Sequence, residues 1–225
     1  MGLSFKHRVL LVLFLLCIIV GVGMTYYYYS LQEYQGIDVS HHQGLIDWKK
    51  VATDKNIQFV YIKATEGATY IDETYTKNIK GARENGIKAG SYHYLKNSSS
   101  IQEQFENFKN VVDKDLQDLL PMVDIEEEVE KDSIKLFCQL IKDYYGKSPV
   151  IYGTNQSYNK YCAPYFNNYY LLIGRYGDAA PKIKGKGHYS IWQFSDKGKV
   201  PGIEIAVDLD RFHPDFELSM IYLNE

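Results

Sequence analysis

Short apolar runs alternate with polar stretches of helical character along most of this 225-residue chain. The apolar runs are too short for buried helices and are bounded by turn-forming or charged residues, so they are predicted to be β-strands. The predicted strands are Gly36–Ser40, Phe59–Ala64, Lys88–Tyr94, Leu120–Glu126, Val150–Gly153, Tyr170–Arg175, Tyr189–Phe194 and Val207–Arg211. The predicted helices are Ile46–Asn56, Tyr75–Asn85, Ser99–Val112 and Ser133–Gly146. This order favours an α/β fold, a parallel sheet or barrel covered by helices.

The second half of the chain departs from that alternation. The segment from Arg175 to Tyr189 is rich in Gly, Lys and Pro and has no apolar periodicity, so no full crossover helix is expected there. Strands with helices missing in the second half predict an irregular TIM-like (β/α) barrel.

The N-terminus has the pattern of an export segment. A basic stretch from Lys6 to Arg8 precedes an apolar run from Val9 to Met24 and a tyrosine block, Tyr26–Tyr29. Because no small-residue cleavage site follows and tyrosines suit the headgroup layer, residues 1–30 are predicted to be an uncleaved signal anchor, with a cleaved signal peptide as the alternative. Residues 31–225 then form one exported domain, either membrane-anchored and extracytoplasmic or secreted.

Composition excludes several classes of protein. A net charge of -3 disfavours nucleic-acid binding, which needs a basic face. The 3 cysteines contain no CxxC pair and are too few for a disulfide scaffold. Spacing leaves open whether Cys138 and Cys162 pair. The 21 tyrosines suggest amphipathic surfaces such as sugar-binding grooves.

Carboxylates lie within or at the ends of strands that are far apart in the sequence. Asp38 is late in the first strand, Asp124 and Glu126 close the fourth, and Asp208 and Asp210 lie in the last. In parallel α/β barrels the carboxyl ends of the strands form the active-site face, and the first and last strands are neighbours. These acids are therefore expected to converge on one pocket.

The spacing of Asp124 and Glu126 places both on one face of a strand, because side chains alternate. Two carboxyls this close cannot both ionise freely, so one is expected to keep its proton and serve as an acid. Hydrolysis of a glycosidic bond needs such a pair. Glu127, Glu128 and Glu130 continue the acidic run and are interpreted as solvated charges.

Six segments of the chain resemble glycoside hydrolase family 25, the N-acetylmuramidase lysozymes. They are Gly36–Ser40, Phe59–Gly67, Gly90–Tyr94, Asp124–Glu126, Ile191–Phe194 and Val207–Phe212. The resemblance covers roughly Gly36 to Phe216. It implies a flattened, irregular barrel and cleavage of the β-1,4 bond between N-acetylmuramic acid and N-acetylglucosamine in peptidoglycan.

Site residues follow from the resemblance by motif. Glu126 matches the general acid, Asp124 its partner carboxylate, acting as nucleophile or through the substrate's acetamido group, and Asp38 and Asp208 match the other acids of the pocket. The chain departs from the family pattern at Leu172–Gly174, where an aromatic residue and an alanine are usual, and at Asp210, where asparagine is usual.

Several further side chains are predicted to bind substrate, by stacking on sugar rings or by hydrogen bonding. They are Tyr61, Lys63, Glu66, Tyr92, Tyr94, Tyr152, Arg175, Trp192 and Gln193, and Tyr176 is a further candidate for sugar stacking. Lys63 and Glu66 are also expected to form a buried ion pair.

Other functions are less consistent with the sequence. His41, His42 and His93 lie in no zinc-site pattern, so no metal and no cofactor are expected. The alternatives are a chitinase-like hydrolase of N-acetylglucosamine polymers, a non-catalytic cell-wall glycan-binding module and a metal-dependent deacetylase. The expected partners are peptidoglycan strands and, through the N-terminal segment, a membrane, with the protein a monomer.

Overall fold

The computed structural model describes residues 5–32 and 34–224 of the chain. It divides into two units, Met1–Glu33 and Tyr34–Glu225, close to the predicted boundary after residue 30. The first unit is a single helix, α1 (Phe5–Gln32). No helix among the described residues combines the length and the apolar character that crossing a membrane requires. The side chains of Tyr26–Tyr29 lie outside the described ones.

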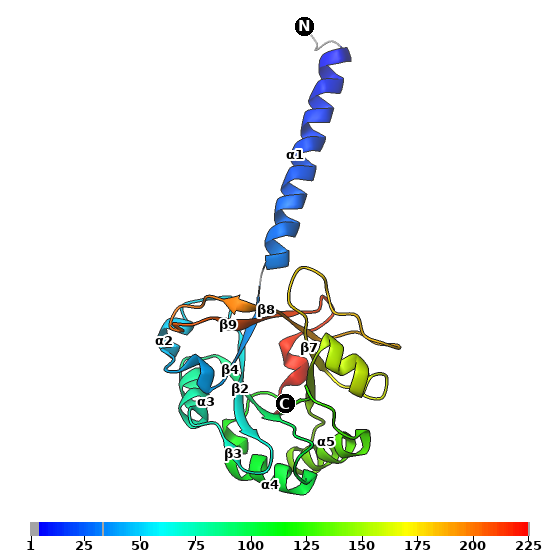
Figure 1. The fold of residues 1–225 in the computed structure, drawn as a ribbon. Helices are drawn as coiled ribbons and strands as arrows, with labels where there is room; N and C mark the ends of the chain where they lie inside the picture. The colour runs from blue at the N-terminus through cyan, green and yellow to red at the C-terminus, as the bar shows by residue number, and fades with distance from the viewer. Residues whose placement is uncertain (1–4, 33, 225) are drawn as a thin grey trace. The chain divides into compact units, whose positions relative to one another are not determined.

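The second unit is built around a closed barrel (Figure 1). In the described residues, the strands lie in the order β1-β9-β8-β7-β6-β5-β4-β2-β3, and pairing of β1 with β2 closes the ring and leaves β3 at its edge. The strands are β1 (Gly36–Val39), β2 (Phe59–Glu66), β3 (Tyr70–Ile71), β4 (Lys88–Tyr94), β5 (Met122–Asp124), β6 (Val150–Thr154), β7 (Leu171–Gly174), β8 (Ile191–Gly198) and β9 (Val207–Phe212).

One strand of the ring, β9, runs opposite to the others. From β1 through β2, β4, β5, β6 and β7 to β8, neighbouring strands run parallel, whereas β9 is antiparallel to both β8 and β1. No helix lies between β8 and β9, where every residue is described. The direct return is the reason for the antiparallel pairing, because parallel strands need a long crossover connection.

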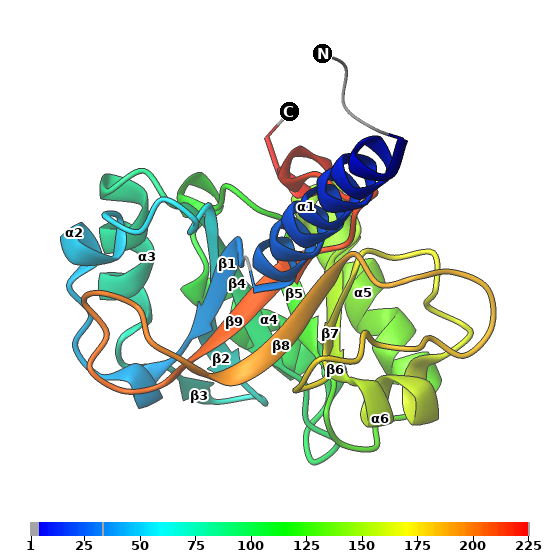
Figure 2. The ribbon, with the colours of Figure 1, turned by 90° about the horizontal axis from the view of Figure 1, so that it is seen from above.

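Helices cover only part of the barrel. Figure 2 shows α2 (Trp48–Val51) and α3 (Tyr75–Glu84) on one flank of the strands, and α5 (Lys131–Tyr145) and α6 (Asn155–Ser157) on the opposite flank. The remaining α-helix of this unit is α4 (Ile101–Val111), which packs on α5 and β2. The prediction of an irregular barrel with helices missing in the second half is confirmed.

Two predicted elements are shorter than expected. The helix predicted over Ile46–Asn56 is the single turn α2, capped by Asp47, whose carboxylate accepts from the Lys50 amide. The strand predicted over Leu120–Glu126 begins only after Pro121, which has no N–H to give to a ladder. It ends at Asp124, and Glu126 lies in the loop that follows β5, so the expectation that both acids lie on one face of a strand is wrong.

The core is continuous and apolar. The run Phe59–Ile62 on β2 is fully buried on both faces, as expected for a parallel strand between a barrel interior and covering helices. Cys138 on α5 and Cys162 are buried free thiols in this structure.

Candidate active site

A pocket of about 170 Å³ opens at the edge of the barrel where the parallel strands end. It brings together acids from β1, β5, the loop after β5, and β9. Its lining residues are Asp38, Val39, Ser40, His42, Gln43, Tyr92, Met122, Asp124, Glu126, Tyr152, Tyr176, Gln193 and Asp208.

Two different strand directions deliver these acids to one edge. Asp124 is the last residue of the parallel strand β5, as the sequence predicts. Asp208 is the second residue of β9, and it reaches the same edge because β9 runs in the opposite direction. The expectation that the carboxyl end of the last strand faces the pocket is therefore wrong for β9, although Asp208 does line the pocket.

Asp124 and Glu126 differ in exposure. The Asp124 side chain is buried, and its Oδ1 has no hydrogen-bond partner, whereas Glu126 stands exposed in the pocket. Burial, then the charge of Glu126, raises the pKa of Asp124 well above its usual value, and Lys63 opposes the shift. Desolvation by the surrounding protein also raises the pKa of Glu126, whereas a hydrogen bond with Tyr152 and the charge of Lys63 lower it. Raised pKa values in both acids favour one shared proton over two negative charges.

A second acidic group lies on β1 and β9. Burial, followed by the charges of Asp208 and Asp210, raises the pKa of Asp38 well above its usual value. Burial and then Asp196 raise the pKa of Asp208 to about 6. Asp210 is fully buried, neither of its carboxyl oxygens has a hydrogen-bond partner, and burial followed by the charge of Asp208 raises its pKa.

Asp38 has a specific partner in the pocket wall. Gln193 Nε2 donates to Asp38 Oδ2 at 2.7 Å, and Gln193 Oε1 accepts from the Tyr152 hydroxyl at 2.9 Å. The pKa of Asp38 is lowered by this bond, against the larger effect of burial. Tyr152 and Gln193, both predicted from the sequence to bind sugar, are thus hydrogen-bonded to each other, and Gln193 is hydrogen-bonded to the predicted catalytic residue Asp38.

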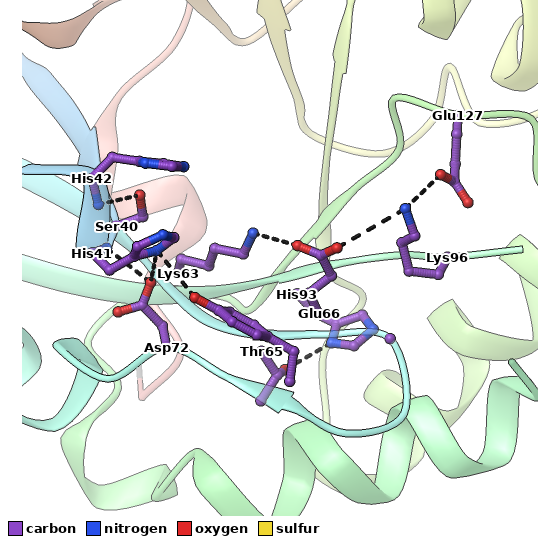
Figure 3. A network of polar contacts seen from close by, with 12 residues as sticks. Ser40, His41, His42, Lys63, Thr65, Glu66, Asp72, His93, Lys96 and Glu127 are labelled. Carbon is purple, nitrogen blue, oxygen red and sulfur yellow. Dashed lines mark hydrogen bonds and ion pairs between the residues drawn. The ribbon is translucent and has the colours of Figure 1, made fainter. Parts of the chain in front are cut away.

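Four charged side chains, beginning with Lys63 and Glu66 on β2, form consecutive ion pairs (Figure 3). Lys63 Nζ lies 2.6 Å from Glu66 Oε2, while Lys96 lies 3.9 Å from Glu66 and 2.8 Å from Glu127. The expected Lys63–Glu66 pair is present. The Tyr94 ring has the ammonium groups of Lys63 and Lys96 each 5.2 Å from its centroid. Lys63, Glu66 and Tyr94 are outside the residues that line the pocket, so their predicted contact with substrate stays a prediction.

Three other predicted sugar ligands have their polar groups engaged elsewhere. The Tyr61 hydroxyl donates to the Leu120 carbonyl in the core at 3.0 Å. Trp192 Nε1 donates to the Arg175 carbonyl, and the ring is 4.8 Å from the Arg211 guanidinium. Arg175 itself donates to the Ala180 carbonyl at 2.6 Å. None of the three lines the pocket, and alternation along β8 explains why Trp192 faces away when Gln193 faces in.

Tyr176, a candidate for sugar stacking, also lines the pocket. Five lining residues are absent from the predicted site residues, namely Val39, Ser40, His42, Gln43 and Met122. Ser40, His42 and Gln43 lie just after β1, which already supplies Asp38, so the rule that sites form at strand ends could have found these three. Val39 and Met122 lie within β1 and β5, and the strand-end rule does not single them out. Ser40 also caps the turn that carries His42.

One group among the described residues has ligand atoms close enough to hold a metal ion, namely His188, His213 and Asp215. None of these three lines the pocket. The histidines considered from the sequence, His41, His42 and His93, do not form such a group among the described residues. His41 instead contacts Asp72 at 3.0 Å, and His93 contacts Thr65 at 2.7 Å (Figure 3).

Comparison with known proteins gives a consistent result. The family model described as "Glycosyl hydrolases family 25" matches residues 37–203. The uncharacterised protein YegX of Escherichia coli (strain K12) is 34% identical over 192 residues, covering 81% of this chain and 70% of that protein. The autolytic lysozyme of Clostridium acetobutylicum is 33% identical over 183 residues, covering 79% of this chain and 55% of that protein.

The fold has solved counterparts as well. The crystal structure of a bacterial lysozyme from Streptomyces coelicolor superposes with a TM-score of 0.73 and 29% sequence identity, covering 84% of this chain and 95% of that one. Sequence and structure comparisons therefore point to the same kind of protein.

Proposed function

The chain belongs to glycosyl hydrolases family 25, and from this we infer that it is a lysozyme-type glycosidase that cleaves peptidoglycan. The bond is the β-1,4 linkage between N-acetylmuramic acid and N-acetylglucosamine. The observation that carries the assignment to this pocket is the pair Asp124 and Glu126, two acids with raised pKa values that line it together. The pocket and the acid pair are what glycosidic hydrolysis requires.

In the proposed first step, Glu126 acts as the general acid. Its carboxyl donates a proton to the glycosidic oxygen while the bond from that oxygen to the anomeric carbon breaks. A raised pKa supports this role because the acid must still hold its proton at the working pH. Its exposure in the pocket leaves it accessible to a polymer.

Asp124 is proposed to act on the same sugar as Glu126. In the mechanism we favour, the carbonyl oxygen of the substrate's 2-acetamido group attacks the anomeric carbon, and Asp124 accepts the acetamido N–H and stabilises the positive charge. Water then opens the cyclic intermediate, and the Glu126 carboxylate takes the proton of that water. Asp124 is suited to the stabilising role because its Oδ1 is buried without a partner.

A trapping experiment separates this route from direct attack by Asp124. A slow fluorinated substrate is incubated with the enzyme, and the intact protein is analysed by mass spectrometry. No glycosyl adduct is expected. An adduct that peptide mapping places on Asp124 would establish a covalent intermediate instead.

Asp38 and Asp208 are proposed to complete the pocket by fixing the sugar ring. Both line it, from neighbouring strands. Carboxylates at this place can accept hydrogen bonds from sugar hydroxyls, and their charge favours the positive charge that develops in the transition state.

Product analysis tests the reaction itself. Purified peptidoglycan is digested, the products are reduced with borohydride, and the new ends are identified by mass spectrometry. Reduced muramic acid is the expected new end. Reduced glucosamine, or release of acetate alone, would contradict the assignment.

The location of the enzyme rests on the N-terminal sequence. We propose that residues 1–30 export the domain and keep it at the outer side of a membrane, because basic residues precede an apolar run and no cleavage site follows. Cell fractionation tests this. Intact protein in the membrane fraction supports the anchor, and shortened protein in the medium indicates a cleaved signal peptide.

A further inference from the structure

Two histidines and an aspartate lie together where β8 begins and β9 ends, outside the residues that line the pocket. One ring nitrogen of His188, one of His213 and one carboxylate oxygen of Asp215 lie within 4.8 Å of one another. The two imidazole rings face each other, with centroids 4.2 Å apart and planes 16° from parallel. Imidazole nitrogens and a carboxylate oxygen are the ligands of many metal sites.

The backbone brings the two imidazoles together. The His213 amide donates to the Ser190 carbonyl at 2.9 Å, one rung beyond the paired residues Ile191 and Phe212. This hydrogen bond extends the pairing of β8 with β9. It therefore joins the segment that carries His188, two residues before Ser190, to the residue that follows β9.

A turn from His213 to Phe216 returns Asp215 to the imidazole. The Phe216 amide donates to the His213 carbonyl at 2.9 Å, and Pro214 takes the second position, where its fixed φ favours such a turn. Phe216 is buried and packs on Phe212 with ring centroids 5.3 Å apart, so the turn is anchored in the core. Asp215 Oδ2 is thereby held 3.7 Å from His213 Nδ1.

Both imidazoles can offer a lone pair. His188 Nδ1 lies 2.9 Å from the Tyr189 carbonyl oxygen, so in the neutral ring this nitrogen carries the proton and Nε2 presents the lone pair. His213 Nδ1 accepts from the Asp215 amide at 3.2 Å. An ion that takes this lone pair displaces only that hydrogen bond, and water can satisfy the amide because Asp215 is exposed.

The spacing suits a zinc ion after a small movement of side chains. Ligand atoms about 2.0–2.2 Å from a tetrahedral zinc ion lie about 3.4 Å from one another. The 3.7 Å between His213 Nδ1 and Asp215 Oδ2 is close to that value. Stacked rings direct their lone pairs side by side, so the His188 ring has to tilt out of the stack to reach the same ion. Because His188 is exposed, this tilt needs no repacking of the core.

We propose that His188, His213 and Asp215 bind one divalent transition-metal ion such as Zn²⁺, with water completing its coordination. Two imidazoles and one carboxylate favour such an ion over Mg²⁺ and Ca²⁺, which take oxygen ligands. The ion ties the end of the segment Arg175–Tyr189, which contains no helix or strand, to the turn after β9. It therefore stabilises the barrel where a crossover helix is missing. The sequence has no zinc motif here because strand pairing, rather than local spacing, unites the ligands.

Titration of the full chain with zinc tests the proposal. The purified protein is treated with EDTA, exchanged into metal-free buffer and titrated with ZnCl₂ by isothermal calorimetry. His188→Gln and Asp215→Asn are each expected to weaken zinc binding about tenfold or more, because each removes a ligand. Unchanged affinity in either variant, or no saturable binding by the wild type, overturns the proposal.

His42→Gln is the matched control. His42 also lies against a second histidine, His41, with ring centroids 4.1 Å apart, but among the described residues this pair has no third ligand close enough for a metal ion. Zinc affinity in this variant is expected to equal that of the wild type. A loss of affinity in His42→Gln would contradict the proposal, because His42 lines the pocket and the ion would then bind there.

Thermal unfolding gives an independent readout. Zinc at about ten times its dissociation constant is expected to raise the melting temperature of the wild type by about 3–5 °C, because the ligands converge only in the folded domain. The increase should be absent in His188→Gln at the same zinc concentration, and MgCl₂ should not reproduce it. No increase in the wild type, or an equal increase in His188→Gln, overturns the proposal.

Discussion

Asp38 on β1 lies directly opposite Asp208 on β9, in the antiparallel pairing of these two strands. Residues opposite one another on such strands have Cβ atoms about 4.5–5.5 Å apart, so like charges there repel. The pairing of β1 with β9 places two acids from the two ends of the domain in one pocket. Ionisation of both Asp38 and Asp208 therefore destabilises the folded state.

Asp208→Asn is expected to stabilise the domain at neutral pH. The pKa of Asp208 is raised from 3.8 to about 6, so the folded state is favoured while the group is protonated, and this advantage is lost as pH rises from about 4 to about 6. Above that window the variant should be more stable by about 1 kcal/mol, since the group is partly solvated. Thermal unfolding at pH 4 and pH 7 measures the difference. Equal effects at the two pH values would contradict it.

Asp210→Asn is also expected to stabilise the domain, for a different reason. Both carboxyl oxygens of Asp210 are buried without hydrogen-bond partners, and burial followed by the charge of Asp208 raises its pKa. An amide of the same size removes the cost of ionisation, so the melting temperature at pH 8 is expected to rise by about 2–4 °C. At pH 4 the two proteins should melt together. A lower melting temperature for Asp210→Asn at pH 8 would contradict this, because it would mean that the ionised carboxylate of Asp210 is stabilised by a hydrogen-bond or ion-pair partner.

Gly174→Ala is expected to destabilise the domain by about 1–3 kcal/mol through overpacking. The added Cβ would lie 2.8 Å from the Tyr152 hydroxyl oxygen. Adding Tyr152→Phe removes that oxygen and should restore part of the lost stability. Urea unfolding of the single and double variants measures the recovery. If the losses of stability in the two single variants simply add in the double variant, the Cβ at position 174 does not clash with the Tyr152 hydroxyl.

Lys63→Met is expected to raise the pKa of Glu126. The ammonium group of Lys63 lowers the pKa values of both Asp124 and Glu126. Its removal is expected to shift the alkaline limb of kcat/KM upward by less than about one pH unit. Because Glu66 is the ion-pair partner of Lys63 and raises the pKa of Asp124, Lys63→Met with Glu66→Gln should shift it less. A downward shift in Lys63→Met would contradict the assigned electrostatics.

Much of the barrel could be predicted because each strand carries its own apolar signal. Predicted and observed ends agree for the strand Lys88–Tyr94, and β1 and β9 differ from their predictions by a residue at one end. The short α2 could not be predicted, because the Asp47 cap and the turn after Val51 depend on contacts such as Asp47 N–H to the Gly202 carbonyl. Apolar pattern alone does not report such contacts.

The acids of the site were predictable, and most of the proposed sugar ligands were less so. Asp38, Asp124, Glu126 and Asp208 all line the pocket. Trp192 and Gln193 are neighbours on β8, yet only Gln193 faces the pocket, and one residue of register decides which of them does. The sequence had no signal for the direction of β9, so the assignment of Asp208 to the pocket rested on the family motif alone.

The rate of Glu126→Gln on purified peptidoglycan tests the central claim most directly. Reducing ends are measured at the pH optimum of the wild-type enzyme, with circular dichroism to verify folding. Glu128→Gln, an exposed acid of the same run, is the control and should keep wild-type activity. Loss of a general acid predicts a fall in kcat of about 10²–10⁴-fold for Glu126→Gln. A folded Glu126→Gln enzyme with near wild-type kcat would contradict the role assigned to this residue.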